Sequence, residues 1–315
     1  MGQRSAQPVL IIFGATASGK SDLAEYLFDT AGPLSGCAGI ISADSMQVYR
    51  GMDIGTAKPS VDLRARIPHF LIDIRNPDEG FGAGDFVACA DSACLDLYNQ
   101  GRLPVLLGGT GFYLRHFILG LPETPPSDAA IRASLKEQCQ RRGLEEMRSL
   151  LLQVDPDSAK RIHQNDEYRI LRALEVYQSS SRPLSSYRLP SLPRPQYRFL
   201  ILALTRPRDE LFTRIDQRVD SMIAQGLVDE VEALVESGYS PADPGLRAIG
   251  YSEFFVHGSL DRDIQAVASR IKSNTRKYAK RQETYLASIP SVVPVYPGSE
   301  ASIASQIKEF LRPLT

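Results

Sequence analysis

The chain has 315 residues, 43% of them hydrophobic and 23% charged, and a formal net charge of −1. These values describe a soluble globular protein with an ample core, and the net charge taken alone argues against a nucleic-acid partner. No apolar run approaches the length of a membrane span, and the polar first eight residues predict no signal peptide. The four cysteines form no C-x-x-C pair, which favours a reduced, cytoplasmic enzyme without structural zinc.

The first predicted element is a buried strand at residues 9–13, which leads directly into a glycine-rich loop at residues 14–21. The loop sequence GATASGKS fits the pattern G-x-x-x-x-G-K-[ST], and apolar residues at helical spacing follow it. In this arrangement backbone N–H groups and Lys20 converge on a phosphate, and the Ser21 hydroxyl is placed to bind Mg²⁺. The residues predicted to bind a di- or triphosphate are Gly14, Thr16, Ala17, Ser18, Gly19, Lys20 and Ser21.

Further strands are predicted at residues 38–43, 67–74 and 104–107, and a helix is predicted at residues 85–100. Strands that alternate with helices indicate an α/β fold with a doubly wound parallel sheet, like that of P-loop NTPases. Ligands bind such sheets beyond the carboxyl ends of the strands. We therefore expect three polar loops to meet over one crevice, at residues 14–21, 44–47 and 108–111.

A change of pattern at residue 121 indicates an inserted segment. A Pro-rich breaker at residues 122–128 precedes a stretch of helical character without strand signals, and a linker rich in Ser, Pro and Arg follows at residues 179–196. The strand pattern resumes at residues 198–205. The predicted architecture is a core of residues 1–120 and 198–315, with a helical domain of residues 121–197 inserted between the fourth and fifth strands.

The last third of the chain is predicted to carry helices and an edge strand. Residues 209–225 are amphipathic, residues 261–288 form a long basic helix, and residues 292–295 close the sheet. Basic residues gather in two segments: eight arginines and three acids lie from Arg182 to Arg218, and six basic residues and one acid from Arg270 to Glu283. This stripe is compatible with binding a polyanion, although each segment alone is more typical of a solvated helix face.

Asp44 follows the second predicted strand and is the candidate catalytic carboxylate. In a nucleotide kinase, which is the first hypothesis for a phosphate loop, a carboxylate at the end of a strand holds Mg²⁺. Asp44 lies, however, among Ser45, Met46, Gln47 and Tyr49, polar and flat groups suited to holding a base. A carboxylate that faces a bound diphosphate can also act as general base on an incoming nucleophile. The residues by themselves leave both roles open.

Together these motifs resemble the tRNA dimethylallyltransferase family, also called tRNA isopentenyltransferases or IPP transferases. The resemblance runs in order from Val9 to Leu286, and the loop DSMQVYRGMDIGTAKP at residues 44–59 is specific to that family. The other segments that carry it are residues 14–21, 108–110, 165–166 with Arg169 and Arg172, 226–231, 250–251 and 280–282. The chain as given shows no counterpart of the zinc-finger extension of many eukaryotic members, which suggests a bacterial enzyme.

The resemblance implies a reaction. The phosphate loop would hold dimethylallyl diphosphate with Mg²⁺ in place of ATP, and the acceptor would be N6 of the adenosine directly 3′ of a tRNA anticodon. Asp44 would take the proton from N6, while Lys20, the loop amides, Mg²⁺ and Arg218 would stabilise the leaving diphosphate. For Arg218, a surface ion pair with Asp216 or Asp220 is an equally good expectation. The products would be N6-isopentenyladenosine and diphosphate.

The resemblance also implies contacts with the anticodon stem-loop, because the acceptor base has to leave its stack to reach Asp44. Taken alone, a helix cap, a solvated charge or ordinary packing would explain each of Thr110, Arg132, residues 168–172 and residues 247–252, and only their ordered set favours tRNA contacts. The residues implied to touch tRNA are Asp44, Ser45, Met46, Gln47, Thr110, Arg132, Tyr168, Arg169, Ile170, Leu171, Arg172, Arg247, Gly250 and Tyr251.

Three other functions are weighed against this one. A nucleotide kinase would turn over ATP with a small acceptor, and an adenylate isopentenyltransferase would prenylate free nucleotides without needing the arginines of the insert. A non-catalytic RNA-binding module would have no use for an intact phosphate loop. We therefore expect a cytoplasmic tRNA dimethylallyltransferase that acts as a monomer and has no membrane partner.

Overall fold

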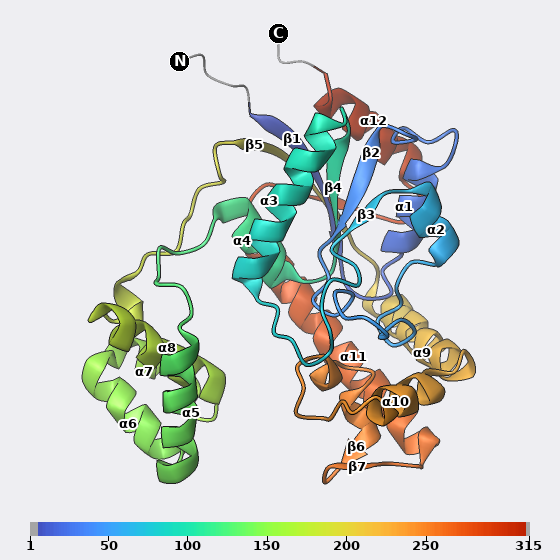
Figure 1. The fold of residues 1–315 in the computed structure, drawn as a ribbon. Helices are drawn as coiled ribbons and strands as arrows, with labels where there is room; N and C mark the ends of the chain where they lie inside the picture. Colours follow the sequence, from blue (N-terminus) through green and yellow to red (C-terminus); the bar gives the residue numbers. More distant parts are fainter. Residues whose placement is uncertain (1–5, 313–315) are drawn as a thin grey trace. The chain divides into compact units, whose positions relative to one another are not determined.

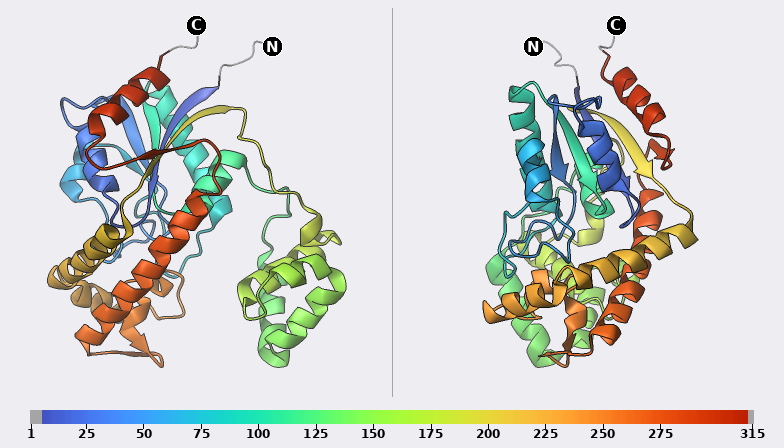
Figure 2. Two further views of the ribbon diagram at one scale, coloured as in Figure 1. Left: turned by 180° about the vertical axis from the view of Figure 1, so that it is seen from behind. Right: turned by 90° about the vertical axis from the view of Figure 1, so that its right-hand side faces the viewer.

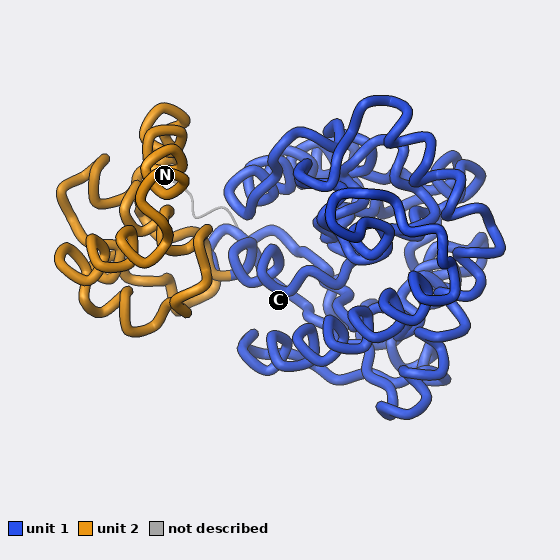
Figure 3. Tube along the Cα trace, turned by 90° about the horizontal axis from the view of Figure 1, so that it is seen from below, with its two compact units in different colours: residues 1–118, 194–315 blue, residues 119–193 orange. Residues whose placement is uncertain are grey.

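The chain divides into two compact units, shown in different colours in Figure 3. The computed structural model describes residues 6–312; unit 1 comprises residues 1–118 and 194–315, and unit 2 comprises residues 119–193. Unit 2 ends before the predicted residue 197 because Arg194 is anchored in unit 1. Its guanidinium donates hydrogen bonds to both oxygens of Asp91, at 2.8 and 2.9 Å, and a third to the Phe117 carbonyl at 2.7 Å.

A parallel sheet forms the centre of unit 1 (Figure 1). Its strands are β1 (Gln7–Gly14), β2 (Ala38–Ser42), β3 (His69–Phe70), β4 (Leu103–Gly108), β5 (Tyr197–Leu204) and β8 (Val292–Val295). All pairs are parallel, and the order β3-β2-β4-β1-β5-β8 confirms the predicted doubly wound fold and its edge strand at residues 292–295. The third strand is shorter than predicted, because Leu71 and Asp73 have φ angles of 64° and 57°, which no strand accommodates.

Helices cover both faces of the sheet, because its strands are apolar on both sides. The helices of unit 1 are α1 (Lys20–Phe28), α2 (Val61–Arg66), α3 (Ala83–Asn99), α4 (Gly111–Leu119), α9 (Arg208–Ala224), α10 (Leu227–Glu236), α11 (Ile264–Leu286) and α12 (Glu300–Phe310). The right-hand view of Figure 2 shows α3 on one face and α1 and α12 on the other. No helix within residues 6–312 is both long and apolar enough to cross a bilayer.

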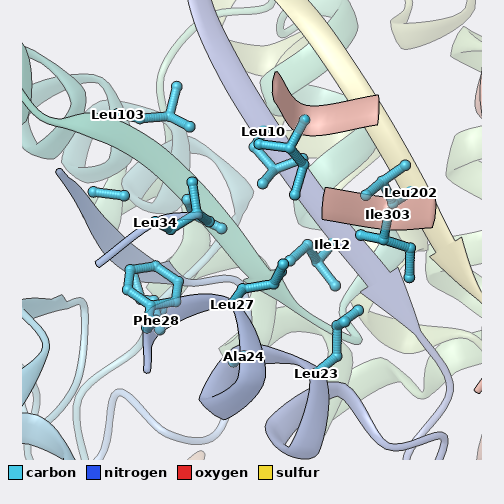
Figure 4. Packing of buried hydrophobic residues seen from close by; sticks show 14 of the residues in the cluster. Leu10, Ile12, Leu23, Ala24, Leu27, Phe28, Leu34, Leu103, Leu202 and Ile303 are labelled. Atoms are coloured by element: carbon cyan, nitrogen blue, oxygen red, sulfur yellow. The ribbon is translucent and has the colours of Figure 1, made fainter. Parts of the chain in front are cut away.

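The core on the α1 face is apolar throughout (Figure 4). Leu10 and Ile12 of β1 are fully buried and belong to one cluster with Leu27 of α1, Leu202 of β5 and Ile303 of α12. Side chains alternate between the two faces along a strand, so this cluster uses every second residue of β1. The phosphate loop between β1 and α1 is therefore fixed at both ends by packed elements.

Three further helices of unit 1, α9, α10 and α11, gather at the carboxyl ends of the sheet strands (Figure 1). The polar loop after β2 packs on them through an apolar side: Val48, Tyr49 and Met52 are buried in one cluster with Val231 of α10 and Ile271 of α11. This loop was predicted from its composition, but its buried side was not. Short elements complete unit 1: η2 (Gly245–Arg247), η3 (Ser252–Phe254), β6 (Phe255–Val256) and β7 (Ser259–Leu260).

Unit 2 is a helical bundle with an apolar core of its own, inserted between β4 and β5 as predicted. Its elements are α5 (Ala129–Arg142), α6 (Leu144–Val154), α7 (Pro156–Arg161), α8 (Glu167–Ser180) and η1 (Leu184–Ser186). Leu135, Met147, Leu151, Ile170 and Leu174 fill the space between α5, α6 and α8. The predicted linker at residues 179–196 contains the end of α8 and all of η1.

A buried carboxylate organises one end of this bundle. Glu175 of α8 is 1% exposed and accepts hydrogen bonds from the Ser127 hydroxyl at 2.7 Å and the Asp128 N–H at 2.8 Å. Arg132 and Arg172 reach the same carboxylate at 3.1 and 3.0 Å. Burial alone would raise the pKa of Glu175, but the hydrogen bonds and the Arg172 charge together lower it below its ordinary value.

We expect Glu175→Ala to lower the free energy of unfolding of the full chain by about 2–4 kcal/mol, because two arginines and a backbone N–H lose their acceptor. Glu137→Ala, which removes an exposed carboxylate on α5, should cost about 0.5 kcal/mol or less. Denaturant unfolding with hydrogen exchange resolved by unit measures both. Since the pKa of Glu175 is lowered in the folded state, its contribution is present at neutral pH and is lost as pH falls through that pKa. Equal stability of the two variants would contradict this role.

Candidate active site

A cavity of about 410 Å³ lies in unit 1 beyond the carboxyl ends of β1, β2 and β4. All three predicted loops contribute to its wall, together with side chains of α9 and α11. A larger hollow of about 610 Å³ lies beside α1 and α2 and contains none of the predicted site residues. The smaller cavity is therefore the candidate active site, because doubly wound sheets bind ligands at this edge.

Four carbonyl groups of the phosphate loop accept hydrogen bonds from basic side chains. Lys20 Nζ donates to the carbonyls of Gly14 and Ala15 at 3.0 and 2.8 Å. Arg214 donates to the Ala17 carbonyl at 2.8 Å, and Arg206 donates to the Ser18 carbonyl at 2.6 Å. The two arginines come from the segment after β5, so residues almost two hundred positions further along the chain hold the loop in place.

Several backbone N–H groups of the same loop are open, meaning that they donate no hydrogen bond within the described residues. Within residues 6–312, no hydrogen bond uses the N–H groups of Ala17, Gly19, Lys20 or Ser21. Ala17 and Gly19 have φ angles of 61° and 101°, and this left-handed backbone turns successive N–H groups toward one side. With the N-terminus of α1 they form a site for an anion such as a diphosphate.

Asp44 stands opposite this anion site at the end of β2. Its Oδ1 accepts hydrogen bonds from the N–H groups of Met46 at 2.9 Å and Gln47 at 3.4 Å, which fixes the carboxylate. Its Oδ2 accepts no hydrogen bond within residues 6–312. The next residue is held as well, because the Ser45 N–H donates to Thr110 Oγ1 at 3.0 Å. A fixed carboxylate with one open oxygen facing a cavity is suited to accept a proton.

Two cations share the cavity with Asp44. Burial lowers the pKa of Lys20 most, the nearby Arg218 charge adds to this effect, and Asp44 opposes both, so that the pKa of Lys20 is about 8. Arg218 itself lines the cavity and interacts with Asp44. The surface ion pair considered for Arg218 is wrong, because Asp216 pairs with Arg276 at 3.4 Å and Asp220 with Lys272 at 2.6 Å. Arg218 is therefore available to a bound anion, and Lys20 keeps one N–H beyond the two that it donates to the loop carbonyls.

Comparison with known proteins decides the family. Residues 47–288 match the family model described as IPP transferase. The chain belongs to the IPP transferase family. The match covers most of the chain and includes parts of both units.

Similar proteins of known name agree with this assignment. The tRNA dimethylallyltransferase 2 of Geotalea daltonii is 44% identical over 308 residues, which cover 95% of this chain and 91% of that protein. The solved full-length tRNA isopentenylpyrophosphate transferase of Bacillus halodurans is 32% identical, with a TM-score of 0.68 and 97% of each chain covered. A eukaryotic dimethylallyltransferase, solved in snapshots of its action on tRNA, is 25% identical, with a TM-score of 0.77, 96% of this chain and 78% of that chain covered. The resemblance seen in the sequence is confirmed.

In this IPP transferase, the loop at residues 53–58 is anchored by side chains that sequence reasoning did not single out. Glu230 of α10 accepts hydrogen bonds from the N–H groups of Asp53, Ile54 and Gly55, at 2.9, 2.7 and 3.1 Å. Lys58, 2% exposed, bridges the carboxylates of Asp53 and Asp73 at 2.6 and 2.5 Å. The only earlier signal was that Glu230 lies in one of the segments that carry the family resemblance.

Some residues expected to touch tRNA are used inside unit 1 instead. Tyr251 is fully buried, and its hydroxyl donates to Glu230 at 2.6 Å, so its assignment as an RNA contact is corrected to a packing residue. The Gln47 side chain bonds Ser42 at 2.8 Å and the carbonyls of residues 56 and 57, which leaves it little capacity for a base. Arg247 and Gly250 do line the cavity.

The expected RNA contacts in unit 2 divide in the same way. Ile170 and Leu171 are 1% and 8% exposed in the apolar core of the bundle, which removes their side chains from the set of RNA contacts. Arg172 donates to the Pro125 carbonyl at 2.8 Å and pairs with Glu175, so it is a structural residue. Arg132 pairs with Glu175 as well and stacks on Tyr168, with its guanidinium 5.6 Å from the ring centroid. Tyr168 and Arg169 are 69% and 70% exposed.

Proposed function

We propose that this IPP transferase transfers a dimethylallyl group from dimethylallyl diphosphate to N6 of the adenosine directly 3′ of a tRNA anticodon. The observation that carries the proposal is the open anion site and the open oxygen of Asp44 in one cavity of a chain of this family. The names of two similar proteins, tRNA dimethylallyltransferase and tRNA isopentenylpyrophosphate transferase, support it. We further propose that the protein is cytoplasmic, since tRNA is found in the cytoplasm, and that it acts as a monomer.

The donor would lie between the phosphate loop and an apolar wall. The open N–H groups of Ala17 and of residues 19–21, with the Lys20 and Arg218 side chains, would bind the diphosphate. Ile215, Val219 and Met222 of α9 line the same cavity and offer an apolar surface to the five-carbon group. A site with polar groups for the diphosphate and an apolar wall for the rest of the donor favours an alkyl diphosphate over a nucleotide, because the ribose and base of a nucleotide need polar partners.

The transfer step replaces a carbon–oxygen bond by a carbon–nitrogen bond and transfers one proton. The lone pair of N6 attacks the first carbon of the donor, and the bond from that carbon to the diphosphate oxygen breaks with its electron pair going to the oxygen. The proton released from N6 goes to Oδ2 of Asp44. The leaving diphosphate gains negative charge, which Lys20, Arg218 and the loop amides stabilise where it develops.

Magnesium is the cofactor proposed for this step. The Ser21 hydroxyl lines the cavity and makes no hydrogen bond within residues 6–312, so it is available as a ligand. No group of three or more His, Cys, Asp or Glu suited to a metal is found in the described part of the chain. Ser21 would therefore hold Mg²⁺ jointly with the oxygens of the diphosphate, where the ion neutralises charge on the leaving group.

The direct test is mass analysis of tRNA incubated with the protein, Mg²⁺ and dimethylallyl diphosphate. The expected result is the mass of one dimethylallyl group added at the adenosine 3′ of the anticodon, with release of diphosphate. ATP should be neither required nor hydrolysed. Prenylation of free adenine nucleotides with no modification of tRNA would instead identify an adenylate isopentenyltransferase, and ADP release in the presence of an acceptor would identify a kinase.

Donor affinity is expected to fall as pH rises above about 8. Burial and Arg218 lower the pKa of free Lys20 to about 8, and a bound diphosphate would raise it. Below pH 8 Lys20 is already charged in the free protein. Above pH 8 Lys20 has to take up a proton when the donor binds, so the affinity for dimethylallyl diphosphate should drop by up to about tenfold per pH unit. Titration calorimetry in two buffers of different ionisation enthalpy measures this uptake. Lys20→Arg stays charged and should show no uptake; uptake that persists in it would assign the proton to another group.

A further inference from the structure

Gln282 of α11 joins two loops that are distant from it in the chain. Its Oε1 accepts a hydrogen bond from the Thr16 N–H at 3.0 Å, and its Nε2 donates one to the Gly109 carbonyl at 2.6 Å. The side chain is only 5% exposed. A buried amide with both ends bonded is held in one orientation, because turning it over would place donor against donor and acceptor against acceptor.

The backbone of Gly109 is shaped for this contact. A Cβ added at Gly109 would lie 2.3 Å from Nε2 of Gln282 and 3.2 Å from the Gly14 carbonyl oxygen, so a larger residue does not fit beside the amide. The pairing of β1 with β4 ends at Phe13 and Gly108. Beyond that point Gln282 continues the connection between the two strands, at the position where the phosphate loop begins.

The connection leads on to the proposed general base. Thr110 follows Gly109, and its Oγ1 accepts the hydrogen bond from the Ser45 N–H, next to Asp44. Two side chains, Gln282 and Thr110, therefore link the phosphate loop to the loop that carries the carboxylate. Tyr278, one helical turn before Gln282, lines the same cavity and interacts electrostatically with Asp44. The face of α11 that meets the cavity thus carries one residue bonded to the phosphate loop and another that interacts with Asp44.

We infer that Gln282 is a positioning residue that sets the separation between the diphosphate held by the phosphate loop and the carboxylate of Asp44. This inference rests on the proposed function, because it concerns the geometry of that transfer. The Thr16 N–H is already used by Gln282 and is not one of the open N–H groups, so losing the bridge should leave donor affinity nearly unchanged. Turnover should fall, because a misplacement of about 1 Å between reacting groups can cost about 10²-fold in rate.

The test uses Gln282→Met in the full chain, since methionine keeps the length of the side chain and removes both hydrogen bonds. We expect kcat for tRNA prenylation to fall by about 10- to 100-fold, with the dissociation constant for dimethylallyl diphosphate within about threefold of the unchanged protein. Hydrogen exchange at the Thr16 N–H should speed up. The matched control is Gln265→Met, which changes an exposed glutamine of the same helix and should leave all three measurements unaltered.

Gly109→Ala disturbs the same bridge from the other side and gives a second variant if Gln282→Met does not fold. The same division between kcat and donor affinity is expected from it. Unchanged turnover in both variants, or loss of donor affinity with unchanged kcat, would overturn the inference. If the unaltered chain does not prenylate tRNA, the proposed function fails. The exchange rate at Thr16 and the donor affinity then still decide whether Gln282 holds the loop.

Discussion

Asp44→Asn is expected to lower the turnover number for tRNA prenylation by roughly 10²–10⁴-fold, the usual effect of losing a general base. Asparagine keeps the shape of the side chain, and its Oδ1 can still accept the hydrogen bonds from the N–H groups of Met46 and Gln47. It presents an amide nitrogen in place of the open Oδ2, so the proton of N6 has no acceptor. The loop should therefore stay in place while the chemical step fails.

Single-turnover kinetics with tRNA and dimethylallyl diphosphate measure this loss apart from binding and product release. Donor affinity should change little or rise, because Lys20 and Arg218 lose an opposing negative charge while the open N–H groups remain. Asp62→Asn, an exposed carboxylate of α2, is the matched control and should turn over at the normal rate. Near-normal turnover of Asp44→Asn would remove Asp44 from the role of base and leave it a group that orients Mg²⁺ or the acceptor.

Replacing unit 2 by a short Gly/Ser linker is expected to abolish tRNA prenylation at physiological salt and to leave donor binding intact. The structure supports such a replacement, because the Arg194 N–H donates to the Ile118 carbonyl at 2.8 Å, so the two ends of the insert are neighbours. Unit 1 also keeps its own cores and the whole cavity. Calorimetry with dimethylallyl diphosphate and a filter-binding assay with tRNA measure the two properties separately.

The salt dependence of tRNA binding reports how many phosphates unit 2 contacts. Each contact contributes about −0.7 to −0.9 to the slope of log affinity against log salt, so the linker variant should have a flatter slope. Arg172 is not expected to contribute to the slope, since it is hydrogen-bonded inside the bundle. Arg169 is exposed and is expected to contribute. Arg169→Ala should reduce the slope by about one contact, and Glu137→Ala serves as a control for exposed charge. Wild-type affinity and slope in the linker variant would place the RNA site wholly on unit 1, with the basic helix α11 as the better candidate.

The sequence by itself determined the fold class, the phosphate loop and the family of this protein. Each of these features depends on a local signal. Residues 14–21 carry all fixed positions of the phosphate-loop motif. The buried strands are continuous apolar runs, which are typical of a sheet covered by helices on both faces. The insertion between β4 and β5 was readable because breaker-rich segments flank it. Asp44 was found because it ends a strand at the edge where parallel strands present ligands.

The tertiary structure decided which side chains are free to act. Arg218 is left to interact with Asp44, because Arg276 and Lys272 form ion pairs with the neighbouring Asp216 and Asp220. Arg172 is held inside the helical bundle by its ion pair with Glu175. These partners lie on other turns or other elements, and spacing along a chain says nothing about which of several possible partners a charge will meet. Buried polar groups must be paired, so packing alone determines that Gln282 bonds Thr16 and Gly109 and that Tyr251 bonds Glu230.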